Sequence, residues 1–211
     1  MNKKLTELVF ILDKSGSMAG LEEDTIGGFN AMLRKQQEEE GQARVTTVLF
    51  DNRYELLHDR LDLPSVAPIT GKDYQVGGST ALLDAIGRTV SKVDAVLAKS
   101  KGEFRADRVL FVIITDGMEN ASRHFSRETV ANLVTARREM GWEFLFLGAN
   151  MDAIAVAQSY GIAQDRAQTF LPDTLGMELN FLAMNSAARE FRQKGRISPD
   201  WDEQIRKRSR K

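Results

Sequence analysis

The stretch Val9–Met18, VFILDKSGSM, places four apolar residues directly before an aspartate. A continuous apolar run of this length predicts a strand that is buried on both faces. Beyond Asp13, Ser15 and Ser17 follow at every second position around Gly16. Residues two apart in an extended segment point to the same side, so these three side chains can face one point. The stretch therefore predicts a buried strand that ends in a cluster of side-chain oxygens.

Two kinds of apolar segment alternate along the rest of the chain. Short continuous runs, which favour buried strands, lie at residues 8–12, 45–50, 109–114 and 144–147. Segments with helical spacing lie at residues 26–33, 83–97, 130–134 and 177–191. Alternation of strands and helices is typical of a doubly wound α/β fold with a mainly parallel sheet. Gly27 and Gly28 interrupt the first expected helix, where close packing or a kink would explain them.

Turn-forming residues join two of the extended runs directly. Asp51, Asn52 and Arg53 separate the run at 45–50 from a second one at 54–61. Asparagine tolerates a positive φ, so the spacing predicts a β-hairpin. The second arm would then be one antiparallel edge strand on the sheet.

The length of 211 residues suits one domain with a short tail. We expect the domain to cover residues 1–193, including a C-terminal helix. Residues 194–200, KGRISPD, read as a linker, and residues 194–211 as a polar basic tail in solvent. The run RKRSRK at 206–211 is the only feature that favours nucleic acid, and acidic residues precede it. We therefore expect no nucleic-acid partner.

Composition limits the chemistry and the setting of the protein. The chain has no cysteine, which excludes disulfides and thiolate metal sites, and its net charge is −1. The N-terminal MNKKLTELVF has a short apolar run that reads as a first strand rather than a signal peptide. No apolar run reaches the roughly 18 residues of a membrane span. We expect a cytoplasmic protein without a membrane partner.

Oxygen-bearing residues follow the expected strands at three places. One is the Asp13 cluster, one is Thr115-Asp116-Gly117, and one is Gly77-Gly78-Ser79-Thr80 before a helix. Ligands of open α/β sheets bind at the carboxyl ends of the strands, so these groups can converge. Carboxylates and hydroxyls without histidine or cysteine suit Mg²⁺, or Mn²⁺ or Ca²⁺. Two carboxylates balance one such ion, and an open position would accept a third carboxylate from a partner.

The pattern D-x-S-x-S at residues 13–17, with Gly78-Ser79-Thr80 and Thr115-Asp116-Gly117, resembles the metal-ion-dependent adhesion site (MIDAS) of von Willebrand factor type A domains. The resemblance covers about residues 5–170. It implies a Rossmann-like, mainly parallel six-stranded sheet with helices on both faces. It also implies a protein-binding role in which the ion coordinates an Asp or Glu of a partner protein. The cysteine-free chain is more similar to intracellular bacterial or phage members than to secreted ones.

The resemblance also assigns roles to individual residues. The implied metal ligands are Asp13, Ser15, Ser17, Thr80 and Asp116. Residues next to these ligands would form a rim that contacts the partner: Gly16, Ser79, Gly117, Met118 and Glu119.

Two enzymatic or nucleotide-binding alternatives fit the sequence less well. A Mg²⁺-dependent phosphoryl-transfer enzyme would use Asp13 as its nucleophile, but Ser15 stands where the common phosphohydrolase pattern has a second acid. No general acid is evident for that reaction. A phosphate loop needs glycines that residues 8–13 lack, and Gly77–Thr80 contains no lysine. We therefore expect a binding module and not an enzyme.

Overall fold

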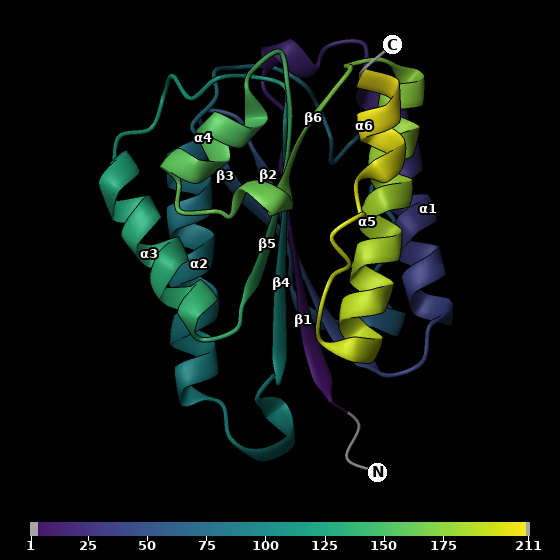
Figure 1. Ribbon diagram of the computed structural model, residues 1–211, viewed down its shortest axis with the longest axis vertical. Coiled ribbons are helices and arrows are strands. Elements are labelled where there is room, and N and C mark those ends of the chain that lie inside the picture. The colour runs from purple at the N-terminus through teal and green to yellow at the C-terminus, as the bar shows by residue number, and fades with distance from the viewer. Residues whose placement is uncertain (1–3, 210–211) are drawn as a thin grey trace.

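A six-stranded sheet forms the centre of the protein, and helices cover both of its faces (Figure 1). The computed structural model describes residues 4–209. The strands are β1 (Leu5–Asp13), β2 (Gln42–Phe50), β3 (Tyr54–Asp62), β4 (Arg108–Thr115), β5 (Glu143–Ala149) and β6 (Ala167–Phe170). Their order is β3-β2-β1-β4-β5-β6, and all neighbours are parallel except the pair of β2 and β3. The predicted α/β fold with one antiparallel edge strand is confirmed.

The helices separate into two layers (Figure 1). One layer holds α1 (Glu22–Glu38), α5 (Thr174–Lys194) and α6 (Glu203–Ser209). The other holds α2 (Leu82–Lys99), α3 (Arg127–Glu139) and α4 (Ala153–Ser159). Short 3-10 turns lie at Gly16–Met18, Leu63–Ser65, Gly102–Phe104 and Gln164–Arg166.

Each layer has its own apolar core against one face of the sheet. In β1, Phe10 packs into the core under α1 and α5, while Val9 and Ile11 pack into the core under α2 and α3. Alternate residues of the strand thus enter opposite cores, which explains why the run has no polar interruption.

The predicted hairpin joins β2 and β3. Phe50 pairs with Tyr54, and the carboxylate of Asp51 accepts a hydrogen bond of 2.5 Å from the backbone N–H of Arg53. An aspartate that bonds the backbone two residues on stabilises a tight turn. Because Phe50 is also aligned with Asp13 in the parallel pair of β1 and β2, the turn lies at the same edge of the sheet as the end of β1.

The segment after α5 differs from the expected linker and solvated tail. Residues 203–209 form helix α6, and Trp201 and Ile205 are buried in the core between α5, α6 and β6. The indole N–H of Trp201 donates to the carbonyl of Asp165 at 2.9 Å. The expectation of a solvated tail is therefore wrong for residues 201–209, because two apolar side chains anchor them. Residues 210 and 211 lie outside the described residues.

Helix α5 also closes the C-terminal end of α1. The buried guanidinium of Arg192 donates to the carbonyls of Gln36 and Gly41 at 2.6 and 3.0 Å. These carbonyls belong to the last turn of α1 and the residues after it, where a helix has no partners of its own.

In the described residues 4–209, no helix combines the length and the apolar character needed to cross a membrane.

The strand order changes direction between β1 and β4. The chain moves from β1 to β2 and β3 on one side, and from β4 to β5 and β6 on the other. Loops that leave β1 and β4 therefore diverge, and the space between them is where open α/β sheets bind ligands. Asp13 ends β1 and Thr115 ends β4, so the predicted oxygen ligands lie at this point.

The two adjacent glycines of α1 predict opposite mutational effects. A Cβ at Gly28 would lie 2.1 Å from the ring of Phe181 in α5, whereas a Cβ at Gly27 has no neighbour within 4 Å. We expect Gly28→Ala to lower the free energy of unfolding by about 1–3 kcal/mol through overpacking. Gly27→Ala should raise it by up to about 1 kcal/mol through helix propensity. Urea unfolding of both variants measures the difference, and equal effects would contradict the close packing of α1 and α5.

Candidate metal-binding site

The carboxylate of Asp13 is buried at the end of β1 and is held from two sides. Its Oδ2 accepts a hydrogen bond of 2.5 Å from the hydroxyl of Thr115, and its Oδ1 accepts one of 2.7 Å from the N–H of Ser15. The hydroxyl of Tyr74 donates to the carbonyl of Asp13. Burial raises the pKa of Asp13 from 3.8 to about 6, and the nearby charge of Asp116 adds to the shift. A negative charge at this position is therefore costly without a cation.

Three hydroxyls lie together next to this carboxylate. The oxygens of Ser15 and Ser17 are 3.1 Å apart, and Thr80 donates to the oxygen of Ser15 at 3.0 Å. The backbone N–H of Gly16 donates to the carbonyl of Gly78 at 3.1 Å, which fixes the two loops against each other. We call the hydroxyls of Ser15, Ser17 and Thr80 the hydroxyl cluster.

Asp116 brings the second carboxylate to the hydroxyl cluster. Burial raises the pKa of Asp116, and a hydrogen bond from the hydroxyl of Ser17 opposes the rise. Its Oδ1 is buried without a hydrogen-bond partner among the described residues. A buried carboxylate oxygen without a donor is costly, and a bound cation would remove that cost.

Gly117 shows how closely the hydroxyls approach this carboxylate. A Cβ built on Gly117 would lie 2.8 Å from the side-chain oxygens of both Ser17 and Thr80, and 3.5 Å from that of Ser15. Only a glycine leaves this space open. The hydroxyls therefore converge on one point directly beside the backbone that follows Asp116.

The structure thus brings all five predicted ligands together from three separate segments of the chain. Two carboxylates and three neutral hydroxyls match the hard-oxygen preference of Mg²⁺, Mn²⁺ and Ca²⁺. No group of three or more His, Cys, Asp or Glu side chains that could hold a metal is found in residues 4–209. The residues fit a divalent cation, while their role as ligands stays a prediction.

Of the predicted rim residues, Gly16, Ser79 and Met118 are exposed, and Met118 is 66% exposed. Glu119 has a different environment. Its carboxylate accepts hydrogen bonds from the N–H groups of Leu83, Ala121 and Ser122 at 2.7–3.0 Å, and from the hydroxyl of Ser122. Its Oε2 therefore attaches the loop after β4 to the start of α2 through Leu83, while its Oε1 bonds the backbone of its own loop. Contact of Glu119 with a partner stays a prediction.

Asp84 is an anchor that the sequence analysis did not identify. Its carboxylate accepts hydrogen bonds of 2.8–3.0 Å from the backbone N–H groups of Arg123, His124 and Phe125. Burial raises the pKa of Asp84, but these donors outweigh that effect and hold it below the usual value. An acidic residue in the first turn of a helix is a common sequence signal, but it does not reveal which distant loop the carboxylate binds.

Comparison with protein families and with curated proteins finds no match to this chain. Solved structures do match. The von Willebrand factor domain of the type V pili tip protein Mfa5 from Porphyromonas gingivalis has a TM-score of 0.62 at 11% identity, over 93% of this chain and 99% of its own. The pilus adhesin SpaC from Lactobacillus rhamnosus GG, in its open conformation, has a TM-score of 0.67 at 12% identity. The proximal thread matrix protein 1 from the mussel byssus has a TM-score of 0.57 at 12% identity.

The chain has a von Willebrand factor type A fold. The match to SpaC covers 90% of this chain but only 30% of SpaC. The match to the byssus protein covers 88% of this chain but only 46% of that protein. The fold therefore corresponds to one part of those longer chains. Identity this low shows the shared fold alone, and the function of this protein has to be argued from its own residues.

The hydrogen bonds of Glu119 predict a specific loss of stability. Glu119→Gln removes the charge and replaces one acceptor oxygen by a donor that faces backbone N–H groups. We expect the free energy of unfolding to fall by about 1–3 kcal/mol. Glu178→Gln, at an exposed position of α5, is the matched control and should change it by less than about 0.5 kcal/mol. Chemical denaturation measures both, and equal stabilities would show that Glu119 is not an anchor.

Proposed function

We propose that this von Willebrand factor A-like domain is a cation-dependent protein-binding module. A divalent ion, Mg²⁺ or else Mn²⁺ or Ca²⁺, would be held by Asp13, Ser15, Ser17, Thr80 and Asp116. The observation that carries the proposal is the buried Oδ1 of Asp116, which has no hydrogen-bond partner within the described part of the chain and lies beside three converging hydroxyls. The arrangement leaves two carboxylates in need of positive charge.

The charge balance indicates what the ion would do. Two carboxylates neutralise one divalent cation, and the hydroxyl ligands add no charge. Mg²⁺ prefers six oxygen ligands and exchanges some of its water for carboxylates. When bound, the ion would supply an electrophilic position for an Asp or Glu of a partner protein. Exposed Gly16, Ser79 and Met118 would border that carboxylate.

The geometry favours binding over catalysis by Asp13. A phosphoryl-transfer nucleophile needs an accessible oxygen, but Asp13 is 1% exposed. Its two oxygens accept hydrogen bonds from Thr115 and Ser15. The pilus and byssus proteins of similar fold support a non-enzymatic role.

The proposal includes neither a nucleic-acid nor a membrane partner. Within the described residues, the basic side chains of α6 pair with acids, as in Arg208 with Asp173 at 2.5 Å and Lys207 with Glu203 at 2.8 Å. These pairs reduce the charge that nucleic acid or a lipid surface would need. We also propose that the protein is cytoplasmic.

Removal of either carboxylate should strongly weaken cation binding. We expect isothermal titration calorimetry to detect Mg²⁺ or Mn²⁺ binding to the wild-type protein. Asp13→Ala and Asp116→Ala should weaken it at least about tenfold, since each removes one of the two charges that balance the ion. Gly117→Ala should weaken it as well, because its methyl group would crowd Ser17 and Thr80.

Asp200→Ala serves as the matched control, since Asp200 is an exposed carboxylate after α5. It should bind the ion as the wild type does. Circular dichroism would verify that all variants fold. A wild-type protein that binds neither ion, or Asp13 and Asp116 variants that bind normally, would contradict the proposed function.

The raised pKa of Asp13 predicts a pH dependence of stability. Its pKa of about 6 in the folded state lies above 3.8, so ionisation of Asp13 destabilises the metal-free fold. This destabilisation is absent below pH 3.8 and complete above about pH 6, where it amounts to about 3 kcal/mol. In chelator, the wild type should therefore gain stability between pH 7 and 5 relative to Asp13→Asn. Mg²⁺ should stabilise the wild type more at pH 7 than at pH 5, and urea midpoints at both values test this.

A further inference from the structure

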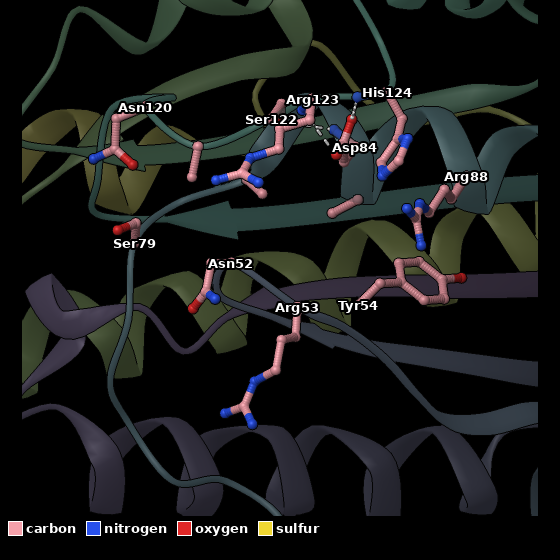
Figure 2. Close-up of a pocket in the computed structure, with 13 residues that line it drawn as sticks. Asn52, Arg53, Tyr54, Ser79, Asp84, Arg88, Asn120, Ser122, Arg123 and His124 are labelled. Atoms are coloured by element: carbon pink, nitrogen blue, oxygen red, sulfur yellow. Dashed lines mark hydrogen bonds between the residues drawn. The ribbon is translucent and has the colours of Figure 1, made fainter.

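A cleft of about 710 Å³ opens beside the hydroxyl cluster (Figure 2). We call it the basic cleft and define it by Arg53, Tyr54, Ser79, Arg88, Arg123 and His124. Its walls are the β2–β3 hairpin, the start of α2 and the loop that follows β4 (Figure 2). The volume lies in the range of sites that bind small molecules or short peptide segments.

The cleft begins next to Thr80, one of the residues proposed to hold the ion. Ser79 lines the cleft and directly precedes Thr80 of the hydroxyl cluster. Asn120, also in the lining, accepts a hydrogen bond of 2.9 Å from the N–H of Thr80 and returns one of 3.0 Å to its carbonyl. A chain that places a carboxylate at the ion can therefore continue directly into the cleft.

The charge of the basic cleft is positive and largely available. Among the described residues, Arg88 and Arg123 form no ion pair, and the guanidinium of Arg88 lies 5.9 Å over the ring of Tyr54. Figure 2 shows Arg123 directed toward the side of the cleft where Ser79 and Asn120 lie. The side chain of Arg53 pairs with Asp51 at 3.3 Å but is 77% exposed.

Among residues 4–209, Asp84 is the only acid that lines this cleft, and its carboxylate already accepts hydrogen bonds. Both of its oxygens accept backbone N–H groups of residues 123–125, and Figure 2 shows Asp84 beside Arg123 and His124. Asp84 therefore orients the loop that carries Arg123 and His124 and leaves the arginine donors for another molecule. Guanidinium groups present several donors in a plane, which matches carboxylates.

We propose that the basic cleft binds acidic residues of the partner that flank the carboxylate held at the ion. This inference rests on the proposed function and extends it, since it gives the partner a chemistry: an Asp or Glu followed by further acidic side chains. A protein segment fits better than single-stranded nucleic acid. Proteins that bind single strands stack bases on aromatic side chains, and here Arg88 lies over the ring of Tyr54, the one aromatic ring of phenylalanine, tyrosine or tryptophan among the described lining residues.

The test uses a fluorescent peptide that has one aspartate followed by four glutamates, and a second peptide with glutamines in place of the glutamates. Anisotropy titrations are made with Mg²⁺ at low and at high salt. The wild type should bind the acidic peptide about tenfold more tightly, and the preference should shrink at high salt. The double variant Arg88→Glu/Arg123→Glu should lose the preference, and Arg88→Gln/Arg123→Gln should lose part of it.

Arg34→Glu is the matched control, because Arg34 is an exposed arginine of α1 away from the cleft. It should keep the preference. The inference is wrong if the two peptides bind alike or do not bind, or if Arg34→Glu loses as much as the cleft variants. It is also wrong if a single-stranded oligonucleotide binds the cleft arginines more tightly than the peptide does.

Calorimetry with Mg²⁺ alone separates this inference from the proposed function. The cleft variants should bind Mg²⁺ as the wild type does, since neither arginine belongs to the ligand set. A wild type that binds neither Mg²⁺ nor Mn²⁺ contradicts the cation-dependent function. A wild type that binds Mg²⁺ but shows no preference for the acidic peptide contradicts the basic cleft alone.

Discussion

The structure depends on a carboxylate buried where the central strand ends. Asp13 joins the two halves of the sheet, since it lies on β1 and accepts a hydrogen bond from Thr115 at the end of β4. Its position at the change of strand direction places it between diverging loops. Burial makes its charge costly. The buried Oδ1 of Asp116, which has no hydrogen-bond partner among the described residues, is a second oxygen that a cation would stabilise. The chemistry of this edge follows from these two acids.

The central strands could be predicted because their signals are local, and the structure brings together the five residues singled out at their ends, whose role as ligands stays a prediction. The apolar run before Asp13 and the spacing of Ser15 and Ser17 contain the information within ten residues. Strand β6 could not be predicted in this way, since it has four residues and little apolar pattern. The packing of α6 was missed because Trp201 and Ile205 stand in a polar stretch, and their burial depends on distant elements.

The loop after β4 shows a second limit of sequence reasoning. The partner contact of Glu119 stays a prediction, but the sequence did not indicate that its oxygens accept N–H groups from the start of α2 and from its own loop. Asp84 makes the reciprocal attachment from the helix to residues 123–125. These long-range bonds leave no periodic trace in the sequence. They hold the loop that carries Asp116 and Gly117 beside the hydroxyl cluster, so the arrangement proposed to hold an ion is fixed by the fold itself.

The candidate ion site and the basic cleft would make different electrostatic contributions to binding of an acidic partner. Asp13 and Asp116 would cancel the charge of the proposed divalent ion, so a partner carboxylate would leave the edge with a net negative charge. Arg88 and Arg123 supply positive charge next to it, and Asp84 is too fully hydrogen bonded to compete for them. Coordination to the ion acts at contact distance, whereas the arginines act through a screened field over several ångströms. The ion would therefore determine whether a carboxylate binds, and the arginines which carboxylate-bearing segments bind best.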